Sequence, residues 1–405
     1  MKNIILFDPD TRDQLLPLTF TRPMSALRVG IRTIGEKWAH EFGGRISYIT
    51  QDYLTDKYPI HISDDNYVIN GSILPNAALC KLIGALQNNE ALQKEGELVA
   101  ARLDRMQFQN LMTDNDIEEL VGFELSDTPY EAINYAWDIF KLNDKAIKDD
   151  FQHLTEGRHS APLSTSNRVI GDAGLIFLES GARVECAILN TENGPIYVGE
   201  GSEIMEGCLV RGPFAMCAHS LLKMGTKIYG ATTVGPYCKV GGEVNNAVLL
   251  GYSSKAHDGY LGNSVIGEWC NLGADTNTSN LKNTYEEVKL WDYTKNSYGR
   301  TGLQFLGLIM GDHSKCGINT MFNTGTVVGV SANIFGAGFA RNFVPSFSWG
   351  GPQGYETYDL TKAFYTIERV LARRDAVLSD VDRAILTQVF ERSAKYRAWE
   401  KQPVL

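Results

Sequence analysis

Apolar residues recur at every sixth position through the middle of the chain, and glycine follows three of them. A period of six fits neither the 3.6-residue helix nor the two-residue strand. It is typical of a hexapeptide β-helix, in which each short strand places one apolar residue inward and then turns a corner. The positions are Val198, Ile204, Val210, Met216, Leu222, Ile228, Val234 and Val240.

Runs with the same period lie on both sides of this stretch. The upstream run is Ile170, Ile176, Ala182 and Ile188. Beyond Val240 the register slips and resumes at Val248, Ser254, Tyr260, Ile266 and Leu272, and after an insertion it returns at Met310, Cys316, Phe322, Val328 and Ile334. Three hexads make one coil, so residues 166–345 predict about nine stacked coils with strands ~4.8 Å apart.

The segment before the repeat has the pattern of an α/β domain. Short buried strands alternate with helical stretches such as Leu79–Glu95, which favours a parallel sheet over residues 1–155. The strands are expected at Asn3–Phe7, Ile46–Thr50 and Tyr67–Asn70. After the repeat, apolar stripes predict two helices in a C-terminal helical tail, residues 356–405, with Ser379 as the N-cap of the second helix.

Composition argues against a nucleic-acid-binding, disulfide-bonded or membrane-spanning protein. The formal net charge is −10 and we find no long Lys/Arg run, so a nucleic-acid partner is not expected. The seven cysteines include no CxxC pair, which favours reduced core thiols over disulfides or a metal site. The apolar run Ile4–Phe7 is too short for a signal peptide or a membrane span. We therefore expect a cytoplasmic protein without a membrane partner.

One polar stretch, residues 242–262, interrupts the apolar repeat. His257 is its only histidine. A lone histidine is commonly a structural hydrogen-bonding residue, but Glu243, Lys255 and Tyr260 nearby favour a functional site. Histidine is a suitable general base near neutral pH, for example toward an amine that attacks a thioester.

This stretch resembles the acetyltransferase domain of the bifunctional N-acetylglucosamine-1-phosphate uridyltransferase/glucosamine-1-phosphate acetyltransferase family. The family pattern of Ser-Lys, His and Tyr-Leu-Gly is met by Ser254-Lys255, His257 and Tyr260-Leu261-Gly262. The likeness continues through Asn271, Ala274 and Asn280, and upstream through Gly212-Pro213-Phe214-Ala215. It implies a left-handed β-helix, a homotrimer, and acetyl-CoA bound between neighbouring subunits.

The resemblance also implies roles for single residues. His257 would be the general base, with Glu243 and Tyr260 as its catalytic neighbours. The substrate would be held by Asn271, Asn280 and Lys255. Ala274 would bind the cofactor, and its N–H would steady the oxyanion.

Two departures bear on the acceptor. Met216 and Asn245 stand where the family has an Arg and a Lys that hold the sugar phosphate. Each charge-assisted contact contributes ~1.5–3 kcal/mol. Either the acceptor is not glucosamine 1-phosphate, or other groups substitute, such as Lys223, Lys239 or Lys255.

The start of the chain resembles sugar nucleotidyltransferases, through Thr11-Arg12, Arg22-Pro23-Met24, Val29–Arg32 and Asn70-Gly71. This implies nucleotide contacts by Arg12, Arg22, Asn70 and Gly71, an NTP as substrate and a role for Mg²⁺. Asp8 and Asp10 replace the family's loop glycines, however, and two carboxylates would repel a triphosphate unless a cation intervenes. Ser72 replaces the family's metal-binding Asp. Two interpretations stay open, namely an active nucleotidyltransferase and a degenerate domain that only binds or packs.

Together these patterns predict a transferase of nucleotide-sugar biosynthesis. It would carry out acetyl-CoA-dependent N-acetyl transfer to an amino sugar or its phosphate, with nucleotidyl transfer to a sugar 1-phosphate in the N-terminal domain. The alternative is a non-catalytic sugar-nucleotide-binding or trimeric scaffold protein.

Overall fold

A computed structural model describes residues 2–114, 120–125 and 128–400. Parts of the predicted first domain (residues 1, 115–119 and 126–127) and of the C-terminal tail (residues 401–405) lie outside these residues. The chain forms two compact units. The N-terminal unit comprises Met1–Leu15, Thr21–Leu27 and Arg32–Tyr135, and the β-helix unit comprises Leu16–Phe20, Arg28–Ile31 and Ala136–Leu405.

The N-terminal unit is built on a sheet that has six strands in the described ranges, in the order β2-β1-β3-β6-β5-β7. As predicted, β1 runs parallel to β2 and β3. β6 and β5 continue the sheet in antiparallel pairs, and β7 runs parallel to β5. The strands are β1 (Asn3–Phe7), β2 (Arg45–Ile49), β3 (Asn66–Asn70), β5 (Glu90–Lys94), β6 (Glu97–Leu103) and β7 (Val121–Glu124), with a separate pair β4 (Ile73–Leu74) and β8 (Glu131–Ala132).

One helix of this unit is shorter than the sequence predicts. The expected helix Leu79–Glu95 ends early, because α2 (Ala77–Ala85) is followed by a turn with φ +70° at Asn89 and then by β5. α1 (Ile34–Phe42) begins with a capping box between Thr33 and Glu36. Such a box pairs two backbone N–H groups that a helix start leaves without partners. A further helix, α3 (Arg105–Asp114), follows β6.

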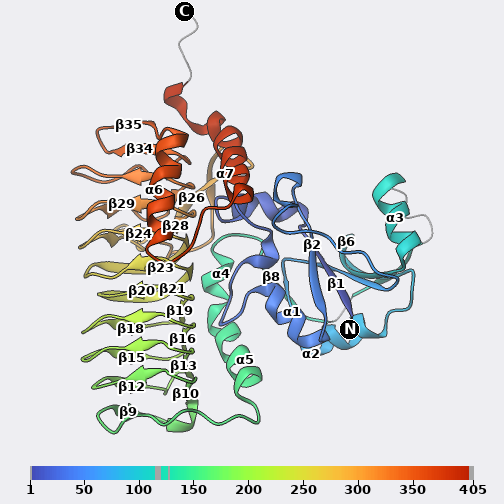
Figure 1. Cartoon of the computed structure of the whole chain (residues 1–405), viewed down its shortest axis with the longest axis horizontal. Helices are drawn as coiled ribbons and strands as arrows, with labels where there is room; N and C mark the ends of the chain where they lie inside the picture. Colours follow the sequence, from blue (N-terminus) through green and yellow to red (C-terminus); the bar gives the residue numbers. More distant parts are fainter. Residues whose placement is uncertain (1, 115–119, 126–127, 401–405) are drawn as a thin grey trace, which may run out of the picture. The chain divides into compact units, whose positions relative to one another are not determined.

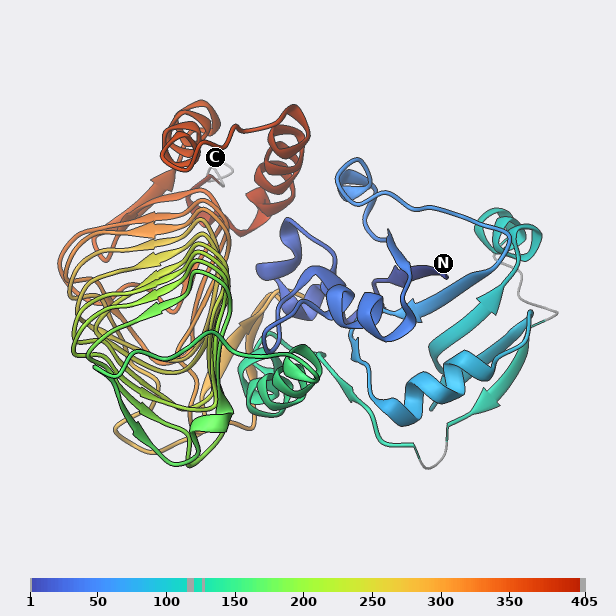
Figure 2. The ribbon, with the colours of Figure 1, turned by 60° about the horizontal axis from the view of Figure 1, so that its bottom comes forward.

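The β-helix unit stacks short parallel strands into coils, as Figures 1 and 2 show. The prediction of an α/β domain followed by a β-helix and C-terminal helices is confirmed. Each coil contributes a strand to three faces. Face 1 contains β10 (Ile176–Leu178), β13 (Ile196–Val198), β16 (Phe214–Met216), β19 (Thr232–Val234), the ends of β21 (Glu243–Gly251) and β23 (Tyr260–Glu268), β28 (Leu308–Met310), β31 (Thr326–Val328) and β33 (Phe343–Val344).

The other two faces follow the same order along the axis. Face 2 contains β9 (Arg168–Ile170), β12 (Ile188–Asn190), β15 (Leu209–Arg211), β18 (Lys227–Tyr229), the starts of β21 and β23, and then β25 (Asn277–Thr278) and β30 (Met321–Phe322). Face 3 contains β11 (Arg183–Val184), β14 (Glu203–Ile204), β17 (Leu221–Leu222), β20 (Lys239–Val240), β22 (Ser254–Lys255), β24 (Asn271–Leu272), β29 (Lys315–Cys316), β32 (Asn333–Ile334), β34 (Ser348–Gly351) and the antiparallel β35 (Gly354–Thr357).

The core of the β-helix follows the predicted hexads from Val198 to Val240 and from Met310 to Ile334. The upstream prediction is out of phase. Leu178 pairs with Val198, so this coil has two residues more than three hexads, and Leu189 faces inward while Ile188 is 37% exposed. Ile170, at 38% exposure, likewise lies on the outer surface.

The register after Val240 also differs from the prediction. Val234 pairs with Leu249, so the coil is three residues short of 18, and the inward positions become Leu249, Lys255 and Leu261. The predicted positions Val248, Ser254 and Tyr260 each precede the true inward residue by one. One cause is the turn at Gly241-Gly242, which holds fewer residues than its neighbours.

Helices and a hairpin complete this unit. α4 (Asp138–Lys141) and α5 (Asn143–Thr155) contact face 1 through β19, β21 and β23. The insertion after β25 forms the hairpin β26 (Lys289–Asp292) and β27 (Ser297–Arg300). The predicted C-terminal helices are α6 (Leu360–Ala372) and α7 (Asp380–Ser393), and Ser379 caps α7 by accepting from the N–H of Asp382.

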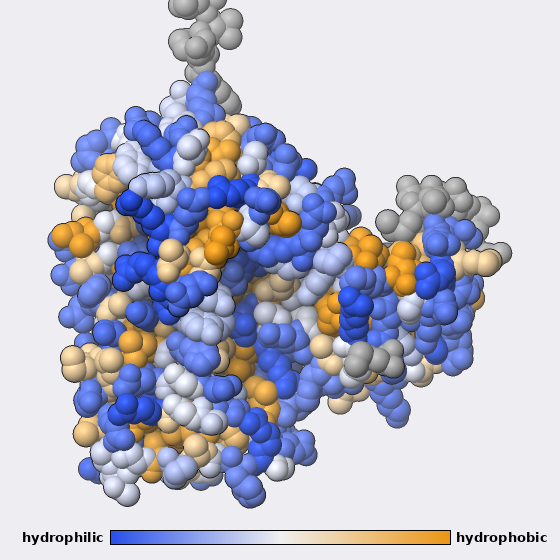
Figure 3. All heavy atoms as spheres, viewed as in Figure 1, coloured by the Kyte–Doolittle hydropathy of each residue, from blue (hydrophilic) through white to orange (hydrophobic). Residues whose placement is uncertain are grey.

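Among the described residues, no helix combines the length and the apolar character needed to cross a membrane. On the visible face of the β-helix, Figure 3 shows hydrophobic patches interspersed with hydrophilic residues.

Candidate functional sites

Two of the predicted acyl-transfer residues, Glu243 and Tyr260, are neighbours on face 2 of the β-helix. Glu243 begins β21 and Tyr260 begins β23, and the register places Lys227, Glu243 and Tyr260 next to one another on successive strands. Neighbouring parallel strands lie ~4.8 Å apart, so these side chains form a continuous outward row. The row brings together two of the three predicted catalytic residues.

Tyr260 is held by a network of asparagines. Its hydroxyl accepts a hydrogen bond from Asn280 Nδ2 at 3.0 Å, and the same amide donates to Asn263 Oδ1 at 2.7 Å. A Cβ on Gly262 would clash with the Tyr260 hydroxyl and lie 2.7 Å from Asn280 Nδ2. The glycine of the Tyr-Leu-Gly motif therefore leaves the space in which Tyr260 and Asn280 meet.

His257 lies on the turn that leads from face 3 into β23 and is exposed. Its ring makes no hydrogen bond within the described part of the chain. The turn lies directly on Gly241-Gly242, since a Cβ on Gly242 would fall 2.8 Å from Asp258 Cα. On its other side the N–H of Asp275 donates to Asp258 O at 3.1 Å, so the His257 turn stacks on the Ala274 turn.

The sequence predicted that Lys255 binds substrate, but the structure places its side chain inside the β-helix, 1% exposed. Its Nζ donates to the carbonyl of His257 and, at 3.2 Å, to that of Asp258. Burial lowers the pKa of Lys255 to about 8, against the opposing effect of Asp258 and Asp275. Lys255 thus holds the His257 turn from within.

The remaining predicted residues lie near the same corner or on another face. The Ala274 carbonyl accepts from the Asn319 N–H at 2.8 Å, and no hydrogen bond to the Ala274 N–H is found in the described ranges. Asn271 begins β24 on face 3, where it is exposed and pairs with Ser254 and Lys315. The structure therefore does not place Asn271 beside Tyr260.

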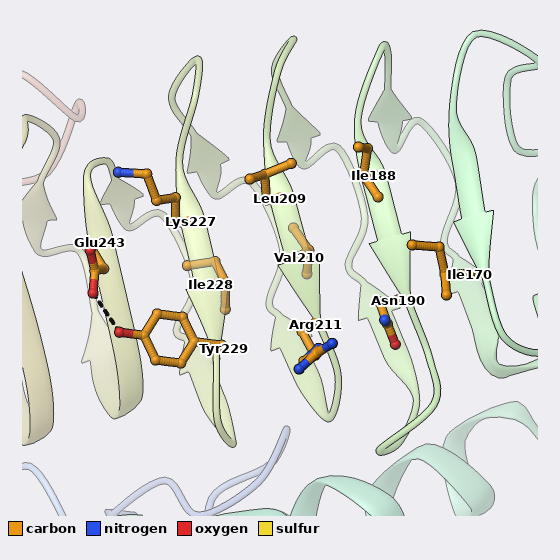
Figure 4. A pocket seen from close by; sticks show the side chains of 10 residues that line it. All are labelled: Ile170, Ile188, Asn190, Leu209, Val210, Arg211, Lys227, Ile228, Tyr229 and Glu243. Carbon is orange, nitrogen blue, oxygen red and sulfur yellow. Dashed lines mark hydrogen bonds between the residues drawn. The ribbon is translucent and has the colours of Figure 1, made fainter.

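A pocket of about 460 Å³ opens on face 2 next to Glu243. Figure 4 shows that its lining side chains come from successive strands, with Tyr229 donating to Glu243. Burial and this hydrogen bond raise the pKa of Tyr229. Sequence reasoning missed Arg211, Lys227 and Tyr229, because outward positions carry no periodic signal. The full lining is Ile170, Ile188, Asn190, Leu209, Val210, Arg211, Lys227, Ile228, Tyr229 and Glu243.

The second candidate site lies at one edge of the N-terminal sheet. The carboxyl ends of β1, β2 and β3 meet there, since Phe7 pairs with both Ile49 and Asn70. Ligands of open α/β sheets bind at this kind of edge. Asp8 is the first residue after β1, and the N–H of Gly71, just after β3, donates to Phe7 O at 2.8 Å.

Asp8 is a structural carboxylate. Its Oδ1 accepts from the Met24 N–H at 2.7 Å, and its Oδ2 accepts from Thr50 Oγ1 at 2.6 Å and from Arg12 Nε at 3.1 Å. Burial raises the pKa of Asp8, while these partners act in the opposite direction. Asp8 therefore faces protein donors, and it does not stand free to repel a nucleotide.

The predicted nucleotide residues are mostly engaged or buried. Arg12 is 5% exposed and also donates to Asp13 Oδ1 at 3.0 Å, and Arg22 is 4% exposed. The hydroxyl and the N–H of Ser72 both donate to Asn70 Oδ1. This donor set does not fit Mg²⁺, because the buried carboxylate is satisfied by hydrogen-bond donors and Ser72 offers no charge.

Comparison with known proteins shows which families this chain is similar to. Residues 4–159 match the sugar nucleotidyl transferase family. The chain is 37% identical over 87 residues to the bifunctional protein GlmU of Methanocaldococcus jannaschii, covering 22% of this chain and 21% of that protein. It is 31% identical over 144 residues to the bifunctional sugar-1-phosphate nucleotidylyltransferase/acetyltransferase of Sulfurisphaera tokodaii, covering 35% of each chain.

Two further likenesses are weaker. The chain is 27% identical over 232 residues to the bifunctional protein GlmU of Burkholderia thailandensis, covering 51% of this chain and 47% of that protein. A solved structure, the Arabidopsis UDP-N-acetylglucosamine acyltransferase, is similar over 60% of this chain and 86% of its own, at 14% identity and a TM-score of 0.25, which is too low to support an inference.

The chain is a divergent relative of these bifunctional proteins, as the sequence predicted. Its matches span less than half the length of each of the three curated relatives.

Proposed function

We propose that this chain is a transferase of nucleotide-sugar biosynthesis whose β-helix transfers an acetyl group from acetyl-CoA to an amino sugar or its phosphate. One observation carries the proposal. Glu243 and Tyr260 are neighbours on face 2, Asn280 donates to the Tyr260 hydroxyl, and the exposed turn with His257 leads directly into the Tyr260 strand. The names of the relatives, which include acetyltransferase, support the same reaction.

In this proposal His257 is the general base. Its exposed ring is free to take a proton from the amine as the N–C bond forms, and to return it to the thiolate released when the C–S bond breaks. Tyr260 and Asn280 would orient the sugar by hydrogen bonds, and Glu243, which accepts from Tyr229, would contribute a fixed negative charge beside them.

Acetyl-CoA would supply the activated acyl group. The Ala274 N–H could bind the acetyl carbonyl of this cofactor. It has no hydrogen-bond partner among the described residues, and it lies on the turn next to His257. A backbone donor of this kind stabilises negative charge that develops on a carbonyl oxygen. We further propose that the chain forms a homotrimer through residues 166–345, which would complete the cofactor site between subunits.

For the N-terminal unit we propose weak or altered nucleotidyl transfer. The proposal rests on Asp8, which is hydrogen-bonded to protein donors, and on Ser72 at the family's metal position. A non-catalytic binding domain is the second candidate, favoured by the ion pair that already engages Arg12. Magnesium-dependent pyrophosphate release from UTP and N-acetylglucosamine 1-phosphate at a robust rate would contradict both proposals.

The test of the acyl-transfer proposal is CoA release by the full chain with a panel of amino sugars, their 1-phosphates and their nucleotide derivatives. His257→Ala should lower the rate by roughly 10²–10⁴-fold, the usual contribution of a general base. His159→Ala is the matched control, because His159 is also exposed but lies in the segment before the β-helix. Equal rates for wild type and His257→Ala would favour the binding or scaffold alternative.

A further inference from the structure

The pocket on face 2 contains two cationic side chains without partners. Arg211 ends β15 and Lys227 begins β18, both exposed on adjacent strands. Within the described residues neither makes a hydrogen bond or an ion pair, while the one carboxylate of the lining, Glu243, accepts from Tyr229. Isolated cations that face a pocket attract a negatively charged ligand.

The positions that carry cations in the related family supply none here. Met216 is fully buried inside the β-helix, and Asn245 is an amide on β21. Lys255 points into the core and donates to backbone carbonyls. A negatively charged group of the acceptor would then need another counter-charge, and the face 2 pocket offers Lys227 and Arg211.

The strand register gives the distance of these cations from the reacting corner. Lys227 lies two strands from Tyr260, and Arg211 lies on the strand beyond β18. At ~4.8 Å per strand, their backbones are roughly 10 Å and 14 Å along the axis from Tyr260. The phosphate of an amino sugar 1-phosphate bound at Tyr260 would reach Lys227 at most, whereas a diphosphate would span both side chains.

The far side of the pocket is apolar. Leu209 lies on the same strand as Arg211, beside Lys227 in the outward row. Ile188 and Ile170 lie on the next two strands, β12 and β9, and the exposures of Leu209, Ile188 and Ile170 are 45%, 37% and 38%. An apolar surface beyond two cations matches a planar, weakly polar group attached to a diphosphate, as in a nucleotide. Figure 4 shows these side chains on successive strands of the same face.

We infer that Arg211 and Lys227 bind the diphosphate of the acceptor, and that the acceptor is a nucleoside-diphosphate-linked amino sugar whose base lies over Ile170, Ile188 and Leu209. This inference rests on the proposed acetyl transfer. It places acetylation after the reaction that attaches the nucleotide to the sugar, and it accounts for the loss of cations close to Tyr260.

The kinetic test compares glucosamine 1-phosphate with UDP-glucosamine as acceptors for the full chain. We expect a lower KM for UDP-glucosamine, and a rise in that KM of about 10-fold or more in Arg211→Met and in Lys227→Met, the usual effect of a charge-assisted contact, with little change in kcat. Arg168→Met is the matched control, because Arg168 is exposed on the same face but does not line the pocket.

A binding test keeps the two proposals distinguishable. Titration with UDP alone should show weaker affinity in Arg211→Met and Lys227→Met than in wild type and Arg168→Met. If the wild type acetylates neither acceptor, acetyl transfer to glucosamine is refuted. The UDP titration then still tests whether Arg211 and Lys227 bind a diphosphate. Equal UDP affinity in all four proteins, or an unchanged KM in both pocket variants, would overturn the inference.

Discussion

Replacing Lys255 by methionine tests the idea that a buried ammonium holds the His257 turn. Lys255 is 1% exposed, and burial lowers its pKa from the usual 10.5 to about 8. Methionine has a similar length and no charge, so Lys255→Met removes the ammonium and its two hydrogen bonds to the His257 turn while it keeps most of the packing.

The pKa shift fixes the sign and size of a pH effect on stability. Between pH 8 and 10.5 the unfolded chain holds the Lys255 proton and the folded chain does not, so raising the pH stabilises the folded wild type. Relative to Lys255→Met, the wild type should gain about 2–3 kcal/mol of unfolding free energy between pH 7 and pH 10. At pH 7 the unfolding free energies of the two proteins should differ by only about 1–2 kcal/mol. In Lys255→Met the loss of two hydrogen bonds is offset because no ammonium has to be buried.

The measurement is chemical denaturation of both proteins at pH 7, 8.5 and 10, at one fixed protein concentration. Ionisable groups that do not interact with Lys255 are common to both proteins and cancel in the difference, whereas Cys316 interacts electrostatically with Lys255 and does not cancel. Lys315→Met is the matched control for stability, because burial also lowers the pKa of Lys315 to about 8 and its ammonium donates to the carbonyl of His313.

The activity result separates a positioning role from a packing role. Lys255→Met should lower kcat for acetyl transfer by about 10-fold or more while the protein stays folded at pH 7, because the His257 turn loses its anchor. A stability difference that does not change with pH would refute the burial of a charged Lys255. Unchanged kcat would refute its role in holding His257.

Three further predictions follow from buried contacts and from assembly. Arg12→Ala should lower the unfolding free energy of the N-terminal unit by about 3–5 kcal/mol in denaturation, because it leaves the buried Asp8 without its cation. A rise in nucleotide KM with unchanged unfolding free energy would contradict this. Gly262→Ala should reduce acetyl transfer more than acetyl-CoA binding, measured by kinetics and titration, since its Cβ would occupy the space shared by Tyr260 and Asn280. Sedimentation should show a homotrimer held by residues 166–345, and a stable monomer at micromolar concentration would remove the shared cofactor site.

The sequence predicted the β-helix because its repeat is set by packing. Each inward residue stacks on its equivalents in the coils above and below, so an apolar side chain is required at every sixth position. The same periodicity cannot report where a coil gains or loses residues. The longer coil before Val198 moved Ile170 and Ile188 to the surface, and the shorter coil after Val234 moved Lys255 into the core.

The candidate sites were predictable to different degrees. Glu243 and Tyr260 are neighbours because the register aligns β21 with β23, and Asn280 donates to the Tyr260 hydroxyl. For Asp8 the sequence suggested repulsion of a nucleotide, because it did not reveal that Thr50 and the backbone of Met24 lie against the carboxylate. Such partners come from strands and turns distant in sequence, and only the folded sheet edge brings them together.

The His257 turn lies where the repeat breaks. The Gly241-Gly242 turn holds fewer residues than its neighbours, and the next turn, with His257, packs directly on its backbone. This packing explains both glycines, because a Cβ on Gly241 would clash with Ala256 O, and Gly242 has φ +71° with no room for a Cβ beside Asp258. The pocket cations Arg211 and Lys227 lie at outward positions, where packing permits any residue. The apolar repeat therefore could not predict them.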